Sequence, residues 1–278
     1  MDQLAAVGLQ PSERGVAVAI TGATSAPGRS WLSVNLAVAL AAAGASVALV
    51  DADPHLGTVA VQLGLAESRS LNFLAHEATL RPIDDQLLQG HVQVSHGVTV
   101  LGGKSLPGQQ PDVPTDVLER VLSALRQDHR FVLVDAGALE CAASQAVALL
   151  CQLVVWVAVP TRLGLDLLDR VLSGPLAPQV RSKPGLAILN RTGPDTLREA
   201  EAAFRQRYGI SVGACVAESR RGRQLAAEGP GPAALTGQLG LSLRACARTV
   251  AAAASSMQLS RPEPGVAELS AARVPGGG

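Results

Sequence analysis

Residues 15–56 read GVAVAITGATSAPGRSWLSVNLAVALAAAGASVALVDADPHL, and this stretch decides the fold. Its first apolar run, 16–20, predicts a buried strand, and the apolar residues of 31–43 recur at helical spacing. A second apolar run ends in Asp51 and Asp53. A strand, a glycine-containing loop, a helix and a strand in this order predict a βαβ unit. The unpaired N–H groups at the start of its helix would suit a phosphate.

The same alternation continues through the rest of the chain. Apolar runs predict further strands at 98–101, 131–135, 153–159, 185–190 and 210–215. Helical spacing predicts helices at 57–65, 70–78, 81–88, 115–126, 142–150, 163–172, 195–208 and 242–257, with Thr115 or Asp116 as the cap of the fourth. Unbroken apolar strands that alternate with helices predict an α/β fold: a mostly parallel, twisted sheet with helices on both faces.

The ends of the chain differ from its middle. Residues 1–14 form a polar segment that we expect to be a flexible lead-in, and the proline- and glycine-rich residues 259–278 predict a disordered tail. We expect residues 15–258 to form a single domain. The tail differs from a basic amphipathic helix, so we do not expect membrane targeting of that kind.

Composition limits the class of protein. The 278 residues carry 23 Lys+Arg and 23 Asp+Glu, a balance that lacks the basic excess typical of nucleic-acid binders, and we expect the arginines of 219–223 to lie on a solvated loop. The 4 cysteines form no CxxC pair and lie in apolar runs, as expected of reduced core residues in a cytoplasmic protein. We find no secretory signal and no apolar run of the length, about 20 residues, that spans a bilayer.

The loop before the long helix allows two interpretations. The first is the phosphate loop of nucleotide triphosphatases, G-x-x-x-x-G-K-[ST], with Ala23 and Arg29 in place of the first glycine and the lysine. The second is the dinucleotide turn TGxxxGxG of short-chain dehydrogenases, in which Asp51 would bind a ribose. That second likeness implies a tyrosine with a lysine four residues later, but the only tyrosine, Tyr208, has Val212 there.

Acidic residues that follow two predicted strands favour the first interpretation. Asp51 and Asp53 end one apolar run and Asp135 ends another. The carboxyl ends of parallel strands form the edge where α/β sheets bind ligands, and Mg²⁺ takes few protein carboxylates. The alternative is that these three acids cap the turns that follow them.

Three segments, 22–65, FVLVDAG at 131–137 and LAILNR at 186–191, resemble the MinD/ParA family of P-loop ATPases. The likeness is to its CpaE/TadZ-like branch, which is associated with pilus and secretion systems. The phosphate loop diverges from the family pattern, because Thr24 and Arg29 stand where the family has its two lysines. The resemblance implies ATP or ADP and Mg²⁺ as cofactors, a homodimer and a protein partner.

The resemblance also implies roles for individual residues. Asp53 would position the hydrolytic water with Asp51 as its partner, and Asn190 would bind the adenine edge, although a cap of its strand is an equal alternative. The implied Mg²⁺ ligands are Ser30, Asp53 and Asp135. The implied nucleotide contacts are Gly22, Thr24, Ser25, Ala26, Pro27, Gly28, Arg29, Ser30, Trp31 and Asn190.

Three functions follow from these observations. The first is a nucleotide-dependent positioning or assembly ATPase for a pilus, secretion or septum-related machine. Its hydrolysis would be weak or absent, since arginine is larger than lysine and differently shaped. The second is a noncatalytic dimeric scaffold of the same fold, and the third is a nicotinamide-binding protein.

Overall fold

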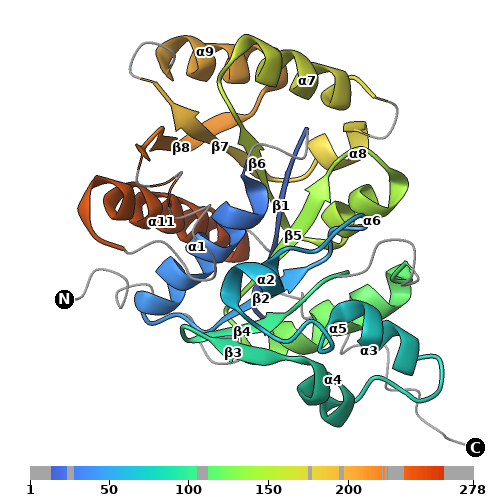
Figure 1. The fold of residues 1–278 in the computed structure, drawn as a ribbon. Coiled ribbons are helices and arrows are strands. Elements are labelled where there is room, and N and C mark those ends of the chain that lie inside the picture. Colours follow the sequence, from blue (N-terminus) through green and yellow to red (C-terminus); the bar gives the residue numbers. More distant parts are fainter. Residues whose placement is uncertain are drawn as a thin grey trace, which may run out of the picture.

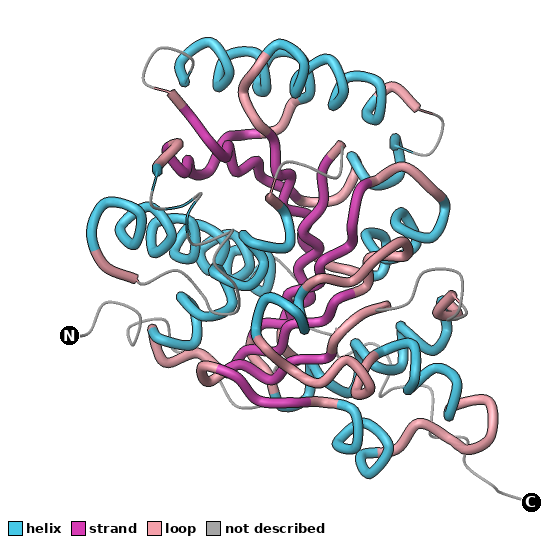
Figure 2. Tube along the Cα trace, in the orientation of Figure 1, coloured by secondary structure: helices cyan, strands magenta, loops and turns pink. Residues whose placement is uncertain are grey.

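A single sheet organises the computed structural model, which describes residues 14–23, 28–104, 112–174, 177–193, 197–220, 222, 224 and 235–259. The sheet has 8 strands in the order β3-β4-β2-β5-β1-β6-β7-β8 and runs through the middle of the molecule (Figures 1 and 2). All neighbouring strands are parallel except β3 and β4. The strands are β1 (Val16–Gly22), β2 (Val47–Asp51), β3 (Gln93–Ser95), β4 (Val98–Leu101), β5 (Phe131–Ala138), β6 (Leu153–Ala158), β7 (Gly185–Thr192) and β8 (Ser211–Ala217).

Helices cover both faces of the sheet (Figure 1). Helices α1, α2 and α11 pack on one face, and the others pack on the opposite face. The helices are α1 (Arg29–Ala42), α2 (Val59–Leu63), α3 (Leu71–Glu77), α4 (Asp85–His91), α5 (Thr115–Asp128), α6 (Ala142–Leu150), α7 (Arg162–Leu172), α8 (Ala177–Arg181), α9 (Leu197–Tyr208) and α11 (Gly237–Leu259). The predicted α/β fold class, with its mostly parallel sheet, is therefore confirmed.

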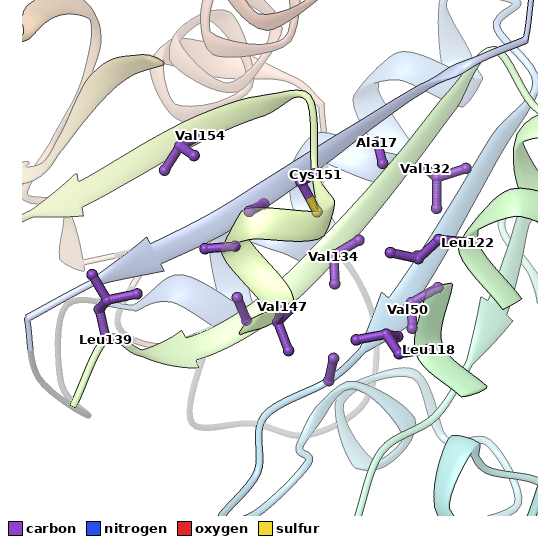
Figure 3. Packing of buried hydrophobic residues seen from close by; sticks show 14 of the residues in the cluster. Ala17, Val50, Leu118, Leu122, Val132, Val134, Leu139, Val147, Cys151 and Val154 are labelled. Carbon is purple, nitrogen blue, oxygen red and sulfur yellow. The ribbon is translucent and has the colours of Figure 1, made fainter. Parts of the chain in front are cut away.

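Side chains of each central strand point alternately into two apolar cores. On β1, Ala17 and Ala19 belong to the core under α5 and α6, whereas Val18 and Ile20 belong to the core under α1 and α11. Figure 3 shows the first core, in which Leu118 of α5 packs near Val50 of the sheet. Because every β1 residue is buried, its carboxyl end is held rigidly at the edge where the loop begins.

Strand register brings the predicted acids together. Asp51 of β2 and Asp135 of β5 are direct register partners, and Ile20 of β1 pairs with Asp135 on the other side. β5 continues beyond the predicted end at 135 to Ala138, where a register shift lets it pair with Gly22. The carboxyl ends of β1, β2 and β5 therefore form one continuous edge.

Several predictions made from the sequence were incomplete or wrong. Edge strand β3 was missed because its residues are polar or exposed, and α8 was missed because it is short and contains Pro178. The cap of α5 is Pro114, which makes no side-chain bond, so Thr115 and Asp116 are already helical. Helix α4 begins at Asp85, later than predicted, because the Asp84 carboxylate caps it by accepting from the Leu87 N–H.

The remaining predictions from the sequence concern the cysteines, membrane-spanning helices and the two ends of the chain. All four cysteines are free, but only Cys151 and Cys246 are buried, while Cys141 at the start of α6 and Cys215 within β8 are partly exposed. Across the described ranges, no helix is long and apolar enough to cross a membrane. The predicted lead-in, apart from Arg14, and the predicted tail after Leu259 lie outside the described residues, so the proposed boundaries 1–14, 15–258 and 259–278 stay predictions.

Candidate functional site

The first turn of α1 lies at the carboxyl edge of the sheet. Gly28 is its N-cap residue, in the left-handed region with φ 78° and without a side-chain cap. A Cβ on Gly28 would lie 2.7 Å from Nδ2 of Asn190, so this position needs glycine both for its backbone and for the close approach of β7. The structure thus brings Gly28 and Asn190 together, and their contacts with a nucleotide stay a prediction. Thr24, Ser25, Ala26 and Pro27 lie outside the described residues.

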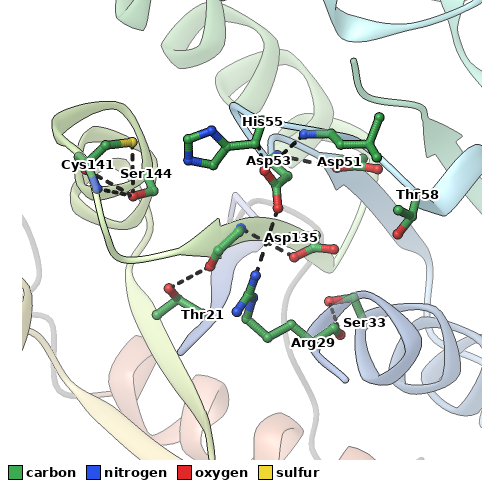
Figure 4. Close-up of polar contacts among 12 residues, drawn as sticks. Thr21, Arg29, Ser33, Asp51, Asp53, His55, Thr58, Asp135, Cys141 and Ser144 are labelled. Atoms are coloured by element: carbon green, nitrogen blue, oxygen red, sulfur yellow. Dashed lines mark hydrogen bonds and ion pairs between the residues drawn. The ribbon is translucent and has the colours of Figure 1, made fainter. Parts of the chain in front are cut away.

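Arg29 is buried beside the acids of the sheet edge. Only 6% of its side chain is exposed, and its Nη2 atom lies 3.9 Å from Oδ2 of Asp53 (Figure 4). Burial lowers the pKa of Arg29, while the charges of Asp135 and Asp53 act in the opposite direction. Its Nε and Nη1 atoms are buried without a hydrogen-bond partner among the described residues. Buried donors without an acceptor are unfavourable by about 1–3 kcal/mol each, so this part of the site is suited to a further hydrogen-bond acceptor.

Asp135 presents an equally incomplete carboxylate. The Gly137 N–H donates to its Oδ1 over 3.4 Å, but its Oδ2 is buried without a partner among the described residues. Burial raises the pKa of Asp135, and the Ser30 hydroxyl and the Arg29 charge oppose that rise. Ser30, the second residue of α1, therefore lies beside Asp135, and the predicted role of the two residues as Mg²⁺ ligands stays a prediction.

Asp51 has a structural role in this arrangement. Its Oδ2 accepts from the Val59 N–H over 2.9 Å at the start of α2, and its Oδ1 accepts from the Asp53 N–H over 3.3 Å. Burial, followed by the charge of Asp135, raises the pKa of Asp51 to about 8. The alternative that these acids cap the turns after them thus describes Asp51 well, and its catalytic role stays a prediction.

Asp53 is held between a turn and Arg29. Its Oδ1 accepts from the N–H groups of His55, over 2.8 Å, and Leu56, over 3.4 Å, so it also caps its own turn. Its Oδ2 faces Arg29, and 14% of the side chain is exposed. The carboxylate is therefore held at the sheet edge by its own turn on one side and by Arg29 on the other.

Two residues that the sequence analysis missed make this geometry possible. Gly137 has φ 67°, and a Cβ there would lie 2.7 Å from Oδ2 of Asp53. The Thr21 hydroxyl donates to the Gly137 carbonyl oxygen over 3.0 Å and ties β1 to β5 (Figure 4). The position of Gly137, two residues after the acid that ends a buried run, was the available signal for a close approach.

A pocket adjoins the start of α1 on the side of β7 and β8. Its lining includes Gly28, Trp31, Asn190, Val216, Glu218 and Leu239. Asn190 is 5% exposed, and its Oδ1 accepts from the Arg191 N–H over 3.0 Å, which is the local cap weighed above as the alternative. Gly22 ends β1 close to β6, where a Cβ would lie 2.4 Å from the Val157 carbonyl oxygen.

Metal coordination by protein groups alone is not supported in this region. The described residues contain no cluster of three His, Cys, Asp or Glu side chains that could hold a metal ion. A cation near Ser30, Asp53 and Asp135 would therefore need further oxygen ligands, such as those of a phosphate.

The sequence itself decides the family. The sequence pattern of the CobQ/CobB/MinD/ParA nucleotide binding domain matches residues 18–229 of this chain. The chain belongs to this family. The predicted MinD/ParA-type nucleotide-binding family is thus confirmed, whereas its CpaE/TadZ-like branch stays a prediction.

Solved structures of family members share the fold. The cell division ATPase MinD of Pyrococcus furiosus is 20% identical with a TM-score of 0.70, over 86% of this chain and 99% of that chain. MinD of Pyrococcus horikoshii complexed with Mg-ADP is also 20% identical with a TM-score of 0.70, over 85% and 96%. A ParA family ATPase from Chlorobium tepidum is 18% identical with a TM-score of 0.69, over 84% and 98%. At these identities the likeness establishes the MinD/ParA fold.

One curated relative is closer in sequence over a short stretch. The antiactivator FleN of Pseudomonas aeruginosa is 48% identical to this chain over 54 residues, which is 19% of each protein. The match therefore spans about a fifth of FleN. It does not show that this chain has the activity of FleN.

Proposed function

We propose that this MinD/ParA-type protein binds ATP or ADP with Mg²⁺ at the start of α1. The observation that carries the proposal is the buried Arg29 guanidinium, whose Nε and Nη1 have no acceptor among the described residues. The positive end of the α1 dipole and the left-handed Gly28 lie beside it. A phosphate is the anion that this combination fits best, because a guanidinium binds phosphate oxygens through two parallel donors.

The site residues fit the nucleotide and its metal. Gly28, Arg29 and Ser30 would hold the phosphates, together with the neighbouring Gly22 and the loop residues Thr24, Ser25, Ala26 and Pro27. Ser30, Asp53 and Asp135 would lie on the metal side, and this is supported by the Oδ2 atom of Asp135, which has no partner among the described residues. Bound Mg²⁺ supplies neutralisation of phosphate charge. Asn190 and Trp31 would contact the base.

Hydrolysis is proposed to be slow or absent. Asp53 would position the water, supported through its backbone by Asp51, but Arg29 pairs with it in this structure. Thr24 and Arg29 replace the two lysines of the family pattern. The loss of a transition-state cation lowers such rates on the order of a thousandfold.

The cellular role is proposed from the resemblance and the relatives. We assign the chain to a CpaE/TadZ-like branch and propose a cytoplasmic homodimer that helps to position or assemble a pilus, secretion or septum-related machine. One similar structure is a MinC:MinD complex from Aquifex aeolicus, and FleN is named an antiactivator. Both names indicate action through a protein partner. The second candidate is a noncatalytic dimeric scaffold, which the Arg29–Asp53 pair favours.

A binding titration beside a γ-phosphate release assay tests these proposals. We expect Mg-ATP and Mg-ADP to bind and NAD to bind much more weakly, with little phosphate release. Sizing of the protein with and without ATP separates the candidates, since only the first needs nucleotide to dimerise. Tight NAD binding without ATP binding would overturn the proposal. Robust phosphate release that Asp53→Ala abolishes would overturn the slow-hydrolysis part.

A further inference from the structure

Trp31 occupies an unusual place for a large aromatic residue. The chain has 2 tryptophans, and Trp156 of β6 is 1% exposed within the sheet core. Trp31, in contrast, lies in the first turn of α1, is only partly buried and lines the pocket beside Gly28. The two indoles therefore differ in whether a ligand can reach them.

Trp31 lies on the same side of the α1 start as Gly28. Both residues line the pocket described above. Asn190 closes the other side, since its Nδ2 lies 2.7 Å from the position of a Gly28 Cβ. The indole and the amide thus line one pocket at the start of α1, next to Gly28, the residue that precedes Arg29.

An aromatic ring and an amide next to an anion site form a combination suited to a nucleotide base. The flat ring offers a stacking face, and the amide, whose Oδ1 accepts from the Arg191 N–H, carries hydrogen-bonding groups of the kind that recognise a base edge. The remaining wall includes the apolar side chains of Val216 and Leu239. A phosphate without a base would leave this pocket unused.

We propose that the Trp31 ring stacks on the base of the bound nucleotide and gives the site its preference for nucleotides over inorganic phosphates. This inference rests on the proposed nucleotide site and extends it to base selectivity. Trp31 also packs against the core under α1, so its side chain supports the helix as well. A test must therefore separate stacking from structural support.

The test compares two ligands and two variants. Calorimetry with Mg-ATP and with inorganic tripolyphosphate is performed on the wild type, Trp31→Ala and Trp31→Phe. Stacking is typically worth about 1–3 kcal/mol, so Trp31→Ala is expected to bind ATP about five- to a hundredfold more weakly. Its affinity for tripolyphosphate is expected to stay unchanged, and Trp31→Phe is expected to keep most of the ATP affinity.

Fluorescence gives a second readout on the same proteins. ATP is expected to quench the wild-type emission, and tripolyphosphate is not. Trp31→Phe retains only the buried Trp156, so its emission is expected to ignore ATP and to report that the fold is intact. Equal losses of ATP and tripolyphosphate affinity in Trp31→Ala would overturn the inference, and so would an unchanged ATP affinity. Failure of the wild type to bind either ligand would overturn the nucleotide site itself.

Discussion

The guanidinium of Arg29 and the carboxylate of Asp53 face each other across the carboxyl edge of the sheet, with Nη2 and Oδ2 3.9 Å apart. The resemblance implies that Arg29 stands at the family's lysine position, and Asp53 is the proposed water-positioning acid. A phosphate that accepts hydrogen bonds from Arg29 would therefore compete with Asp53 for the guanidinium and change the charge around the Asp53 carboxylate. This pairing links nucleotide binding to the acid on which hydrolysis would depend.

The buried Asp51 predicts a pH dependence of stability. Its pKa is raised to about 8 in the folded protein, whereas an unfolded aspartate has a pKa of about 3.9. The folded state therefore keeps a proton that the unfolded state releases above about pH 4. This stabilisation is complete below the unfolded pKa and is lost as the pH rises through the folded pKa, with a slope of up to about 1.4 kcal/mol per pH unit.

Urea unfolding at several pH values between 5 and 8 measures this effect. Asp51→Asn cannot lose a proton, so its free energy of unfolding is expected to fall less steeply with pH than that of the wild type. Asp116→Asn is the control, because that carboxylate is 68% exposed. Parallel profiles for wild type and Asp51→Asn would contradict the assignment.

Gly137 is predicted to be needed for the position of Asp53. Gly137→Ala places a Cβ 2.7 Å from Oδ2 of Asp53, in addition to the strain of an alanine at φ 67°. Gly44→Ala is the matched control, since Gly44 has φ 88° and nothing within 4 Å of its Cβ position. Strain alone is worth about 1–2 kcal/mol, and we expect Gly137→Ala to lose about 1–2 kcal/mol more. Equal losses in urea unfolding would show that Asp53 moves freely.

Restoring lysine at positions 24 and 29 is predicted to increase the rate of ATP hydrolysis. If Thr24 and Arg29 limit hydrolysis, the double variant Thr24→Lys/Arg29→Lys should release γ-phosphate at least about tenfold faster than the wild type, because a compact ammonium replaces the larger guanidinium. Adding Asp53→Asn to the double variant should remove the gain. An unchanged rate in a folded double variant that binds ATP would show that the limit lies elsewhere.

The sequence was sufficient to predict the strands that are covered by helices on both faces of the sheet. Apolar runs such as 131–135 and 153–159 were recognisable because buried parallel strands need continuous apolar residues. Strand β3 has no apolar run because it lies at the edge of the sheet and is not buried on both sides. Its one apolar residue, Val94, is 73% exposed. The cap of α5 was wrong because the extended Pro114 precedes a helix that already includes Thr115.

The positions of the proposed site residues at the ends of strands could be predicted from the sequence, but their contacts could not. The acids and Asn190 could be identified because they follow apolar runs, and the edge of the sheet gathers such positions. The pairing of Arg29 with Asp53 depends on how α1 approaches β2 and β5, which no local pattern encodes. The close contacts at Gly28 and Gly137 depend on β7 and on the turn after β2 in the same way.

The most direct test of the account is a calorimetric titration of Mg-ATP into wild type, Arg29→Ala and Arg120→Ala. Arg120, which is 66% exposed, is the matched arginine outside the site. A hydrogen bond to a charged group is worth about 1.5–3 kcal/mol, so Arg29→Ala should bind about ten- to a hundredfold more weakly while Arg120→Ala matches the wild type. Undiminished ATP affinity in Arg29→Ala, or no ATP binding by the wild type, would contradict the account.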